Sequence, residues 1–382
     1  MDLYNPFSDA VMQEPAVAYD YLHLHPVHLY ADFDPPFYTL SRYADVSAAL
    51  RDIERFSSEF GQGPRFTPPA GMLSNPPQHT FFRALVQQAF TPRAINAMAA
   101  RVHQLAAELL TARTTEAWDL HDDFAFPLPV IVISEMLGVP PEDLHQFKHW
   151  SDASVAAMGS EDPSQYEDTL AELAAYLLDA IRQRRARDSG DDLITALVQA
   201  RSEDNTGLAD EEILSVVSQL LVGGNETTTS LITNAMWRML QHPQLWQTLC
   251  NNPEAYVPIA VEESLRFDPP VLGLYRNTAV DVTLHGETIP AGSKVMLHYA
   301  AANRDPDVFA DAANFRLDRK PQRHLAFGLG VHFCLGAQLA RLEASACLHA
   351  LANMCPDLQL AGDSSRITPF FLWGRRTLPV QG

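Results

Sequence analysis

The chain has 382 residues, of which 47% are hydrophobic, so it is long enough to bury a large core in one domain. Its 27 basic and 47 acidic residues give a net charge of −20, which excludes a general nucleic-acid binder. Residues 1–30 hold no apolar signal region, and no later run is apolar enough to cross a bilayer, which predicts a soluble, cytoplasmic protein with no membrane contact. Four cysteines without Cys-x-x-Cys spacing fit a reducing compartment.

Short strands and helices alternate in the first third of the chain. Residues 28–30 and 37–40 predict a strand pair, and residues 43–50 predict a helix. Glycine and proline between residues 60 and 77 predict a long loop, which in a compact domain often carries function. The histidines at 23, 25 and 28 lack a metal-ligand pattern and are predicted to lie on the surface.

Helix dominates the remainder of the chain. The pattern is helical from Pro92 to about Gln241 and again from Cys334 to Met354, while residues 280–303 and 370–380 alternate like strands. Breaks are expected at residues 126–127, 138–141, 162–163, 188–190 and 205–207. The prediction is a mainly α protein whose small sheet gathers strands from both ends, as a single domain over residues 1–382.

The most informative stretch is Phe327-Gly328-Leu329-Gly330-Val331-His332-Phe333-Cys334-Leu335-Gly336. It places one thiol after two flexible glycines and before a helical segment, so the thiolate would project from a tight loop and accept backbone N–H bonds. An axial ligand of haem iron needs these conditions. A buried structural cysteine beside a turn would leave the aromatic residue, the histidine and the third glycine unexplained. A dinucleotide loop is excluded because its third glycine position is Phe333.

A second unusual segment lies inside the helix predicted for residues 211–241. Gly223-Gly224-Asn225-Glu226-Thr227 interrupts good helix formers, and each glycine costs about 1 kcal/mol relative to alanine. A helix that passes over a bound ligand gains space from glycine and a local hydroxyl from threonine. A hydroxyl beside a carboxylate can relay protons through water, so Glu226 as the acid and Thr227 as the alcohol form a candidate proton-delivery pair.

Both segments resemble signatures of the cytochrome P450 superfamily. The loop matches Phe-Gly-x-Gly-x-(His/Arg)-x-Cys-x-Gly at every fixed position, and the helix matches (Ala/Gly)-Gly-x-(Asp/Glu)-Thr. The resemblance implies that Cys334 ligates the iron of haem b and that Gly223 and Gly224 border a dioxygen groove. It also implies a triangular-prism-like fold, mainly α with small β-sheets, in which haem lies between the long central helix and the Cys-bearing helix.

Other positions match the family's supporting residues. Glu263-Ser264-Leu265-Arg266 resembles its Glu-x-x-Arg helix, which implies a buried ion pair completed by either Arg316 or Arg319. The family usually has Ser or Thr where this chain has Ala209, so Asp210 is expected to cap the long helix instead. The positions that the resemblance assigns to haem binding besides Cys334 are His79, Arg83, Arg276, His332, Phe327, Gly328 and Gly336.

The substrate positions implied by the resemblance are almost all apolar. They are Phe66, Met72, Met158, Leu220, Val271, Leu272, Leu274, Phe370 and Phe371. They imply a hydrophobic small-molecule substrate of terpenoid, aromatic, fatty or steroid type. The chain is too short for a fused flavin reductase, so the resemblance implies a bacterial-type monomer that hydroxylates this substrate with dioxygen. Its electrons would come from a ferredoxin- or flavodoxin-type donor with its reductase, docked where Arg83 and Arg93 supply positive charge.

Two other functions remain open. A peroxide-driven haem-thiolate enzyme would need no electron donor, but such enzymes often lack the acid–alcohol pair. A non-enzymatic haem sensor would need neither a proton relay nor an apolar pocket.

Overall fold

The computed structural model describes residues 4–67, 71–111, 117–140, 144–160, 162–187, 190–201 and 207–382. The chain is 56% helical, with three small sheets in the described ranges, which confirms the mainly α class. It divides into two compact units, each built from separate stretches of sequence: residues 1–79, 259–334 and 370–373, and residues 80–258, 335–369 and 374–382. Residues 141, 188–189 and 205–206, predicted as parts of breaks, lie outside the described residues.

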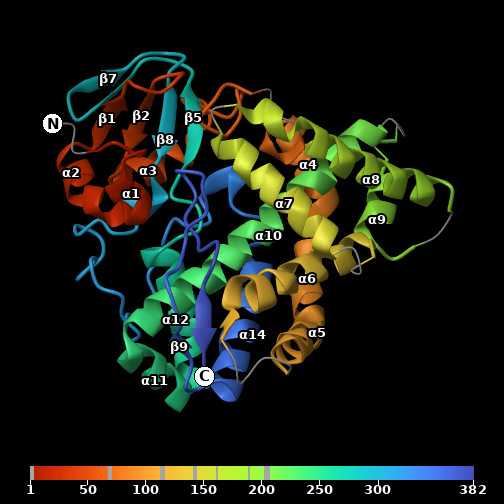
Figure 1. Cartoon of the computed structure of the whole chain (residues 1–382). Helices are drawn as coiled ribbons and strands as arrows, with labels where there is room; N and C mark the ends of the chain where they lie inside the picture. The colour runs from red at the N-terminus through yellow and green to blue at the C-terminus, as the bar shows by residue number, and fades with distance from the viewer. Residues whose placement is uncertain are drawn as a thin grey trace. The chain divides into compact units, whose positions relative to one another are not determined.

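The first unit is organised around a five-stranded sheet in the order β1-β2-β8-β5-β3 (Figure 1). The antiparallel pair β1–β2, with Val27 opposite Leu40, confirms the predicted N-terminal strand pair, and β2 pairs in parallel with β8. The strands are β1 (Val27–Tyr30), β2 (Phe37–Leu40), β3 (Phe56–Ser57), β5 (Leu274–Thr278) and β8 (Lys294–Leu297), with a hairpin of β6 (Val282–Leu284) and β7 (Glu287–Ile289). The unit's short helices are α1 (Asp9–Gln13), η1 (Pro15–Ala18), α2 (Tyr19–Leu24), α3 (Tyr43–Ala49), η2 (Gly71–Leu73), α13 (Tyr299–Ala302) and η7 (Gly330–His332).

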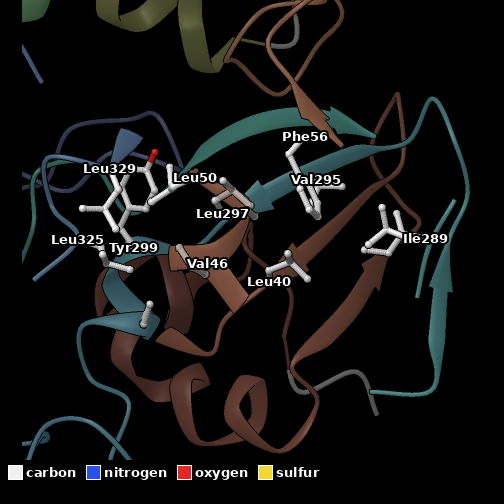
Figure 2. Packing of buried hydrophobic residues seen from close by; sticks show 13 residues of the cluster. Leu40, Val46, Leu50, Phe56, Ile289, Val295, Leu297, Tyr299, Leu325 and Leu329 are labelled. Carbon is white, nitrogen blue, oxygen red and sulfur yellow. The ribbon is translucent and has the colours of Figure 1, made fainter. Parts of the chain in front are cut away.

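Apolar side chains from the sheet, from α3 and from the loop before Cys334 form one cluster in this unit (Figure 2). Leu40, Val46 and Leu297 are fully buried there, and Leu329 brings the cysteine loop into the same core. Burial of such side chains stabilises a fold by roughly 1.5–3 kcal/mol each. The loop that carries Cys334 is therefore anchored by hydrophobic packing as well as by its own hydrogen bonds.

Two expectations for this unit are wrong. His23 and His28 are buried, because His23 Nε2 bonds Ala301 O at 2.9 Å and the His28 ring packs edge-on against Tyr4. Residues 299–302, predicted as part of a strand region, form α13, whose N-cap His298 accepts a hydrogen bond from the Ala301 N–H. The alternating pattern therefore ends with β8.

The second unit is a helical assembly around α10 (Asp210–Gln241). Its helices are α5 (Pro92–Leu110), η4 (His121–Ala125), α6 (Pro127–Leu137), α7 (Leu144–Gly159), η6 (Pro163–Tyr166), α8 (Glu167–Arg185), α9 (Leu193–Gln199), α11 (Pro243–Asn251) and α14 (Ala337–Met354) (Figure 1). The chain passes between the units within α4 (Gln78–Gln87) and α12 (Pro253–Phe267), and η3 (Gln88–Phe90) follows α4. Among the described helices, none is long and apolar enough to cross a membrane.

Three details of the second unit differ from expectation. The C-terminal strand β10 (Pro379–Gln381) pairs with β4 (Trp118–Asp119) and β9 (Gln359–Leu360), so the two chain ends belong to different sheets. The last long helix begins at Ala337, after the cysteine rather than at it. Ala209, not Asp210, is the N-cap of α10. The Glu212 carboxylate accepts the Ala209 N–H at 2.9 Å, while Asp210 pairs with Arg185, so half of a capping box survives.

Candidate active site

The cysteine loop of the first unit holds its thiol outward. Gly328 and Gly330 have φ of 65° and 74°, a region that glycine occupies without steric cost. The Cys334 N–H donates to Phe327 O at 2.9 Å and the Gly328 N–H donates to Leu325 O at 2.8 Å, which closes the turn. A Cβ at Gly330 would lie 2.7 Å from Leu50 O, so the loop lies against the backbone that follows α3. Cys334 is exposed at the end of this fixed loop.

Polar groups gather around His332 in the same unit. Its ring lies edge-on to the buried His79 ring, with centroids 4.5 Å apart, and its nitrogens are 3.4 Å from Ser58 Oγ and Gln62 Nε2. Arg276, on β5, is buried, and its guanidinium donates to Tyr275 O at 2.8 Å. No carboxylate pairs with Arg276 in the described ranges, and burial lowers the pKa of its guanidinium. It is a desolvated cation that lacks a counter-ion from the described protein.

These residues fit a haem. A thiol on a rigid loop suits an axial ligand, and a buried cation without a carboxylate suits a propionate. Gly336 begins the part of the chain that belongs to the second unit, and a Cβ there would meet nothing within 4 Å. Phe327 is half-buried beside the loop, with its ring 6.4 Å from that of Phe333. Arg83, predicted to join this set, lies half-buried in the second unit's part of α4.

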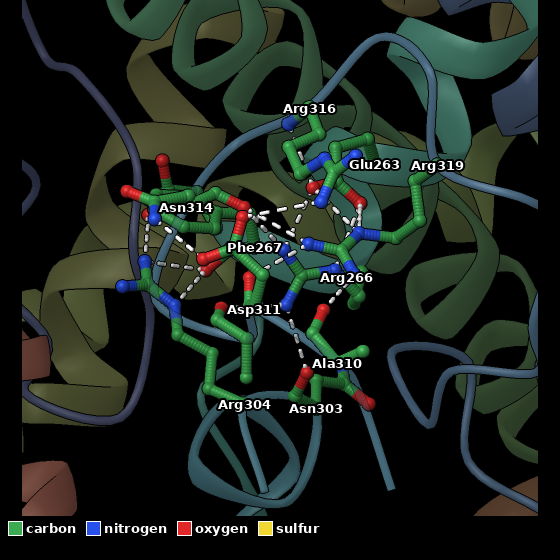
Figure 3. A network of polar contacts seen from close by, with 12 residues as sticks. Glu263, Arg266, Phe267, Asn303, Arg304, Ala310, Asp311, Asn314, Arg316 and Arg319 are labelled. Atoms are coloured by element: carbon green, nitrogen blue, oxygen red, sulfur yellow. Dashed lines mark hydrogen bonds and ion pairs between the residues drawn. The ribbon is translucent and has the colours of Figure 1, made fainter. Parts of the chain in front are cut away.

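The predicted ion pair is a buried network (Figure 3). Arg266 donates to both carboxylate oxygens of Glu263, at 2.7 and 2.8 Å, and both side chains are 2% exposed. Arg319 completes the network with Nε 2.9 Å from Glu263. Arg316 contributes only its backbone N–H, at 2.9 Å, because its guanidinium pairs with Asp318 and Asp311 at the surface. Arg266 also donates to the Asn303, Ala312 and Asn314 carbonyls, which ties α12 to the chain leading toward the cysteine loop.

The glycine-interrupted segment of α10, in the second unit, has two contrasting faces. Gly223 and Gly224 are exposed, and a Cβ at either would meet nothing within 4 Å, so open space lies beside the helix here. Thr227 is half-buried and its hydroxyl donates to Gly223 O at 2.7 Å. Glu226 is buried, and desolvation raises the pKa of its carboxyl. A buried acid followed by a hydroxyl at the border of an open face is an arrangement that can hand over protons.

A charged environment around Glu226 was missed by sequence reasoning. The charges that act on its pKa come from His121, Asp152, Arg376 and Lys148, with His121 the largest of them. These residues lie far apart in sequence. The sequence feature that could have indicated this environment is His121-Asp122-Asp123, just before the apolar run that forms α6.

The predicted substrate residues of the first unit separate into exposed and core positions. Phe66 is 48% exposed and faces Phe60, while Met72, Val271 and Leu274 are half-buried. Leu272, Phe370 and Phe371 are buried. The Leu272 N–H donates to Phe371 O at 2.8 Å, and Phe370 packs 4.5 Å from Phe7. Phe370 and Phe371 therefore also serve the aromatic core of this unit.

In the second unit, Leu220 is buried on α10 and Met158 is 40% exposed on α7. Leu221, the sequence neighbour of Leu220, lines a cavity of about 10 Å³. This cavity has about the space of one water and is too small for a substrate. It is lined by Val130, Phe147, Trp150, Ser151, Leu173, Leu221, Val222 and Asn225.

Comparisons with known proteins agree with this fold. The family model "Cytochrome P450" matches residues 155–353. "Cytochrome P450 109" of Bacillus spizizenii is 36% identical over 389 residues, covering 98% of this chain and 91% of the relative, and a "Cytochrome P450" of Bacillus subtilis is 42% identical over 297 residues, covering 77% and 72%. The solved structure of CYP109Q5 from Chondromyces apiculatus has a TM-score of 0.89 at 35% identity and covers 99% of this chain and 97% of that one.

The mainly helical fold and the outward thiol define a haem-thiolate protein. The chain belongs to the cytochrome P450 family, and it is a P450 monooxygenase. An organic substrate and dioxygen follow from that membership.

Proposed function

We propose that this P450 monooxygenase hydroxylates a hydrophobic small molecule of steroid, terpenoid, aromatic or fatty type. It uses haem b held by Cys334 and electrons from a separate ferredoxin- or flavodoxin-type donor with its reductase. The observation that carries the proposal is the exposed Cys334 at the end of a loop whose backbone is fixed by glycine geometry and hydrogen bonds.

The candidate haem-binding residues of the first unit have separate roles in this proposal. Cys334 supplies the thiolate ligand, and the glycine turn keeps its sulfur projecting from the backbone. Arg276 neutralises a propionate, which would give its buried guanidinium the anion that the described protein lacks. His332 and His79 donate further hydrogen bonds to the cofactor's acidic edge. When bound, the haem supplies oxygen activation at its iron.

The second unit supplies protons. Glu226 is a buried acid, and desolvation raises the pKa of its carboxyl, which favours the protonated form that a proton donor needs. Thr227 accepts a proton from that side and donates one toward the open face beside Gly223 and Gly224. Loss of the hydroxyl would leave oxygen reduction without an ordered proton donor.

The substrate class is supported by apolar side chains and by relatives. The printed names of relatives and neighbours include a vitamin D(3) 25-hydroxylase of Pseudonocardia autotrophica, 38% identical over 367 residues, and CYP109E1 from Bacillus megaterium in complex with testosterone. None of the proposed pocket residues is charged. Titration with testosterone, a fatty acid and a terpenoid, followed by the spectral shift of the haem, tests this part. If only charged or sugar-like ligands shift the spectrum, the apolar substrate class is wrong.

The central experiment is the carbon monoxide difference spectrum of the reduced protein. We expect the red-shifted band of a thiolate-ligated haem, and its loss in Cys334→Ala. A wild-type protein without the band, or a variant that keeps it, would overturn the proposal.

Thr227→Ala tests the proton role separately. The variant should keep the carbon monoxide band and ligand binding but divert electrons from product to peroxide or water. Unchanged coupling would exclude Thr227 as the proton donor. Turnover with hydrogen peroxide alone that equals turnover with redox partners would favour the peroxide-driven alternative, and failure to oxidise any bound ligand would favour a sensor.

A further inference from the structure

Glu226 lies where three elements of the second unit meet α10. Thr229, one turn further along α10, donates through Oγ1 to Ala125 O of η4 at 3.3 Å. Ser151 of α7 accepts from Asn225 Nδ2 at 3.0 Å. A Cβ at Gly374 would lie 2.7 Å from the Ser230 Cβ, so the C-terminal segment passes directly against the next turn. η4, α7 and the C-terminal segment are therefore fixed to the same part of α10 as Glu226.

His121 is the buried ionisable group that η4 contributes. It is 1% exposed, and its Nδ1 lies 2.6 Å from Asp122 Oδ1. Its backbone N–H donates to Asp119 at 2.9 Å, and its ring stacks on Phe126 at 6.1 Å, so the imidazole is held in one orientation. Its Nε2 is buried and has no hydrogen-bond partner in the part of the chain that the structure describes. One nitrogen is thus anchored, and the other is buried with its hydrogen-bonding capacity unused.

Asp122 links His121 to a group of charged side chains that are partly exposed to solvent. Lys148 Nζ lies 3.1 Å from Asp122 and 3.5 Å from Asp152, and Arg376 lies 3.2 Å from Asp122 and 3.0 Å from Asp152. We call these four residues the surface cluster. Their side chains are 21–44% exposed, so the cluster spans the distance from water to the buried imidazole.

The electrostatics follow this arrangement. Burial raises the pKa of Glu226, and the electrostatic interaction with His121 is the largest effect that opposes it. The hydrogen bond from His121 is the largest cause that lowers the pKa of Asp122. The imidazole therefore lowers the pKa of two carboxyl groups, those of Asp122 and Glu226. Three elements bring ionisable groups toward Glu226: His121 and Asp122 from η4, Lys148 and Asp152 from α7, and Arg376 from the C-terminal segment. A fourth element, α14, contributes Glu343, which shares a hydrogen bond with Thr228.

We propose that His121 is a positioning residue for Glu226. Its imidazole, oriented by Asp122, couples the buried carboxyl to the surface cluster and governs how readily Glu226 takes up and releases protons. The inference rests on the proposed role of Glu226 in proton delivery and adds the residue that controls it. In this arrangement His121 acts on proton delivery only through the acid.

The test compares the complete haem-loaded protein with His121→Asn. Asparagine keeps an N–H donor at the position of Nδ1 but cannot carry a proton. His149→Asn is the matched control, because His149 is an exposed histidine on α7 beside the cluster. The first readout is the infrared band of the Glu226 carboxyl, identified by its absence in Glu226→Gln and followed against pH. The second is the fraction of electrons lost to peroxide, measured against pH.

We expect the ionisation midpoint of Glu226 to move upward in His121→Asn, because the His121 interaction that opposes the effect of burial is lost, and to stay in place in His149→Asn. Peroxide loss should rise in His121→Asn and change its pH profile. The same substitution in a Glu226→Gln background should add little further loss, because His121 acts through Glu226. Asp122→Asn removes the carboxylate that orients His121 and should also move the midpoint, so it provides the test if His121→Asn does not fold.

An unmoved Glu226 midpoint in His121→Asn, or in Asp122→Asn where that variant takes its place, would overturn the inference. So would equal losses with and without the Glu226 carboxyl. The carbon monoxide band and the effect of Thr227→Ala do not involve His121, so their failure would strike the proposed function instead.

Discussion

Replacing Glu343 by glutamine should make the protein less sensitive to alkaline pH. Glu343 lies on α14, is 2% exposed, and shares a hydrogen bond with Thr228 of α10. Burial raises the pKa of its carboxyl from 4.5 to about 8, and the bond to Thr228 lowers it by less. At neutral pH the group is therefore mostly a protonated acid inside the core.

The magnitude follows from linkage between protonation and folding. The folded-state pKa lies above the unfolded one, so between pH 4.5 and about 8 the folded chain holds a proton that the unfolded chain has lost. Stability is greatest below this window and falls as the pH rises through it. At about 1.4 kcal/mol per pKa unit, the difference between 4.5 and about 8 amounts to at most about 5 kcal/mol. About half of that falls between roughly pH 6 and pH 8.

Urea unfolding followed by circular dichroism measures the effect. Glutamine cannot ionise, so the free energy of unfolding of Glu343→Gln should gain about 2–3 kcal/mol relative to wild type as the pH rises from roughly 6 to 8. Comparing both proteins with equal haem content cancels the cofactor's own contribution. Glu254→Gln is the control, since its side chain is 91% exposed and should give parallel curves. If the difference between Glu343→Gln and wild type does not change with pH, the reasoning fails.

Two further substitutions test the first unit. Glu263→Gln leaves Arg266 and Arg319 as buried cations without their anion, so the free energy of unfolding should fall by about 3–5 kcal/mol; a loss below about 1 kcal/mol in urea unfolding would show that the network is not needed for stability. Gly330→Ala forces a Cβ to 2.7 Å from Leu50 O and should lower thermal stability and haem retention. Gly292→Ala has a similar positive φ of 80° but open space, so equal losses in both variants would mean that backbone conformation, rather than the collision, is responsible.

Features with a local cause could be predicted from the sequence. The pair β1–β2 follows from two short strand patterns joined by a proline-rich turn, and the structure confirms that the two strands pair. The glycine turn before Cys334 follows from residue types that permit a positive φ. The long helix α10 follows from its composition, although its start at Asp210 depends on a Glu212 bond that bypasses the missing cap. The family followed from two short motifs, because a thiolate loop and a glycine-broken helix need few residues at fixed spacing.

By itself, then, the sequence determined the glycine turn before Cys334, the helical class and the family. Tertiary structure alone decided which distant charges meet. Arg316 and Arg319 have the same charge and nearly the same position in the chain, yet only the guanidinium of Arg319 reaches Glu263, because Arg316 turns toward surface aspartates. His121 gained its place near Glu226 from the packing of η4, α7 and the C-terminal segment on α10. Such contacts arise between residues separated by many positions, and no local pattern in the sequence records them.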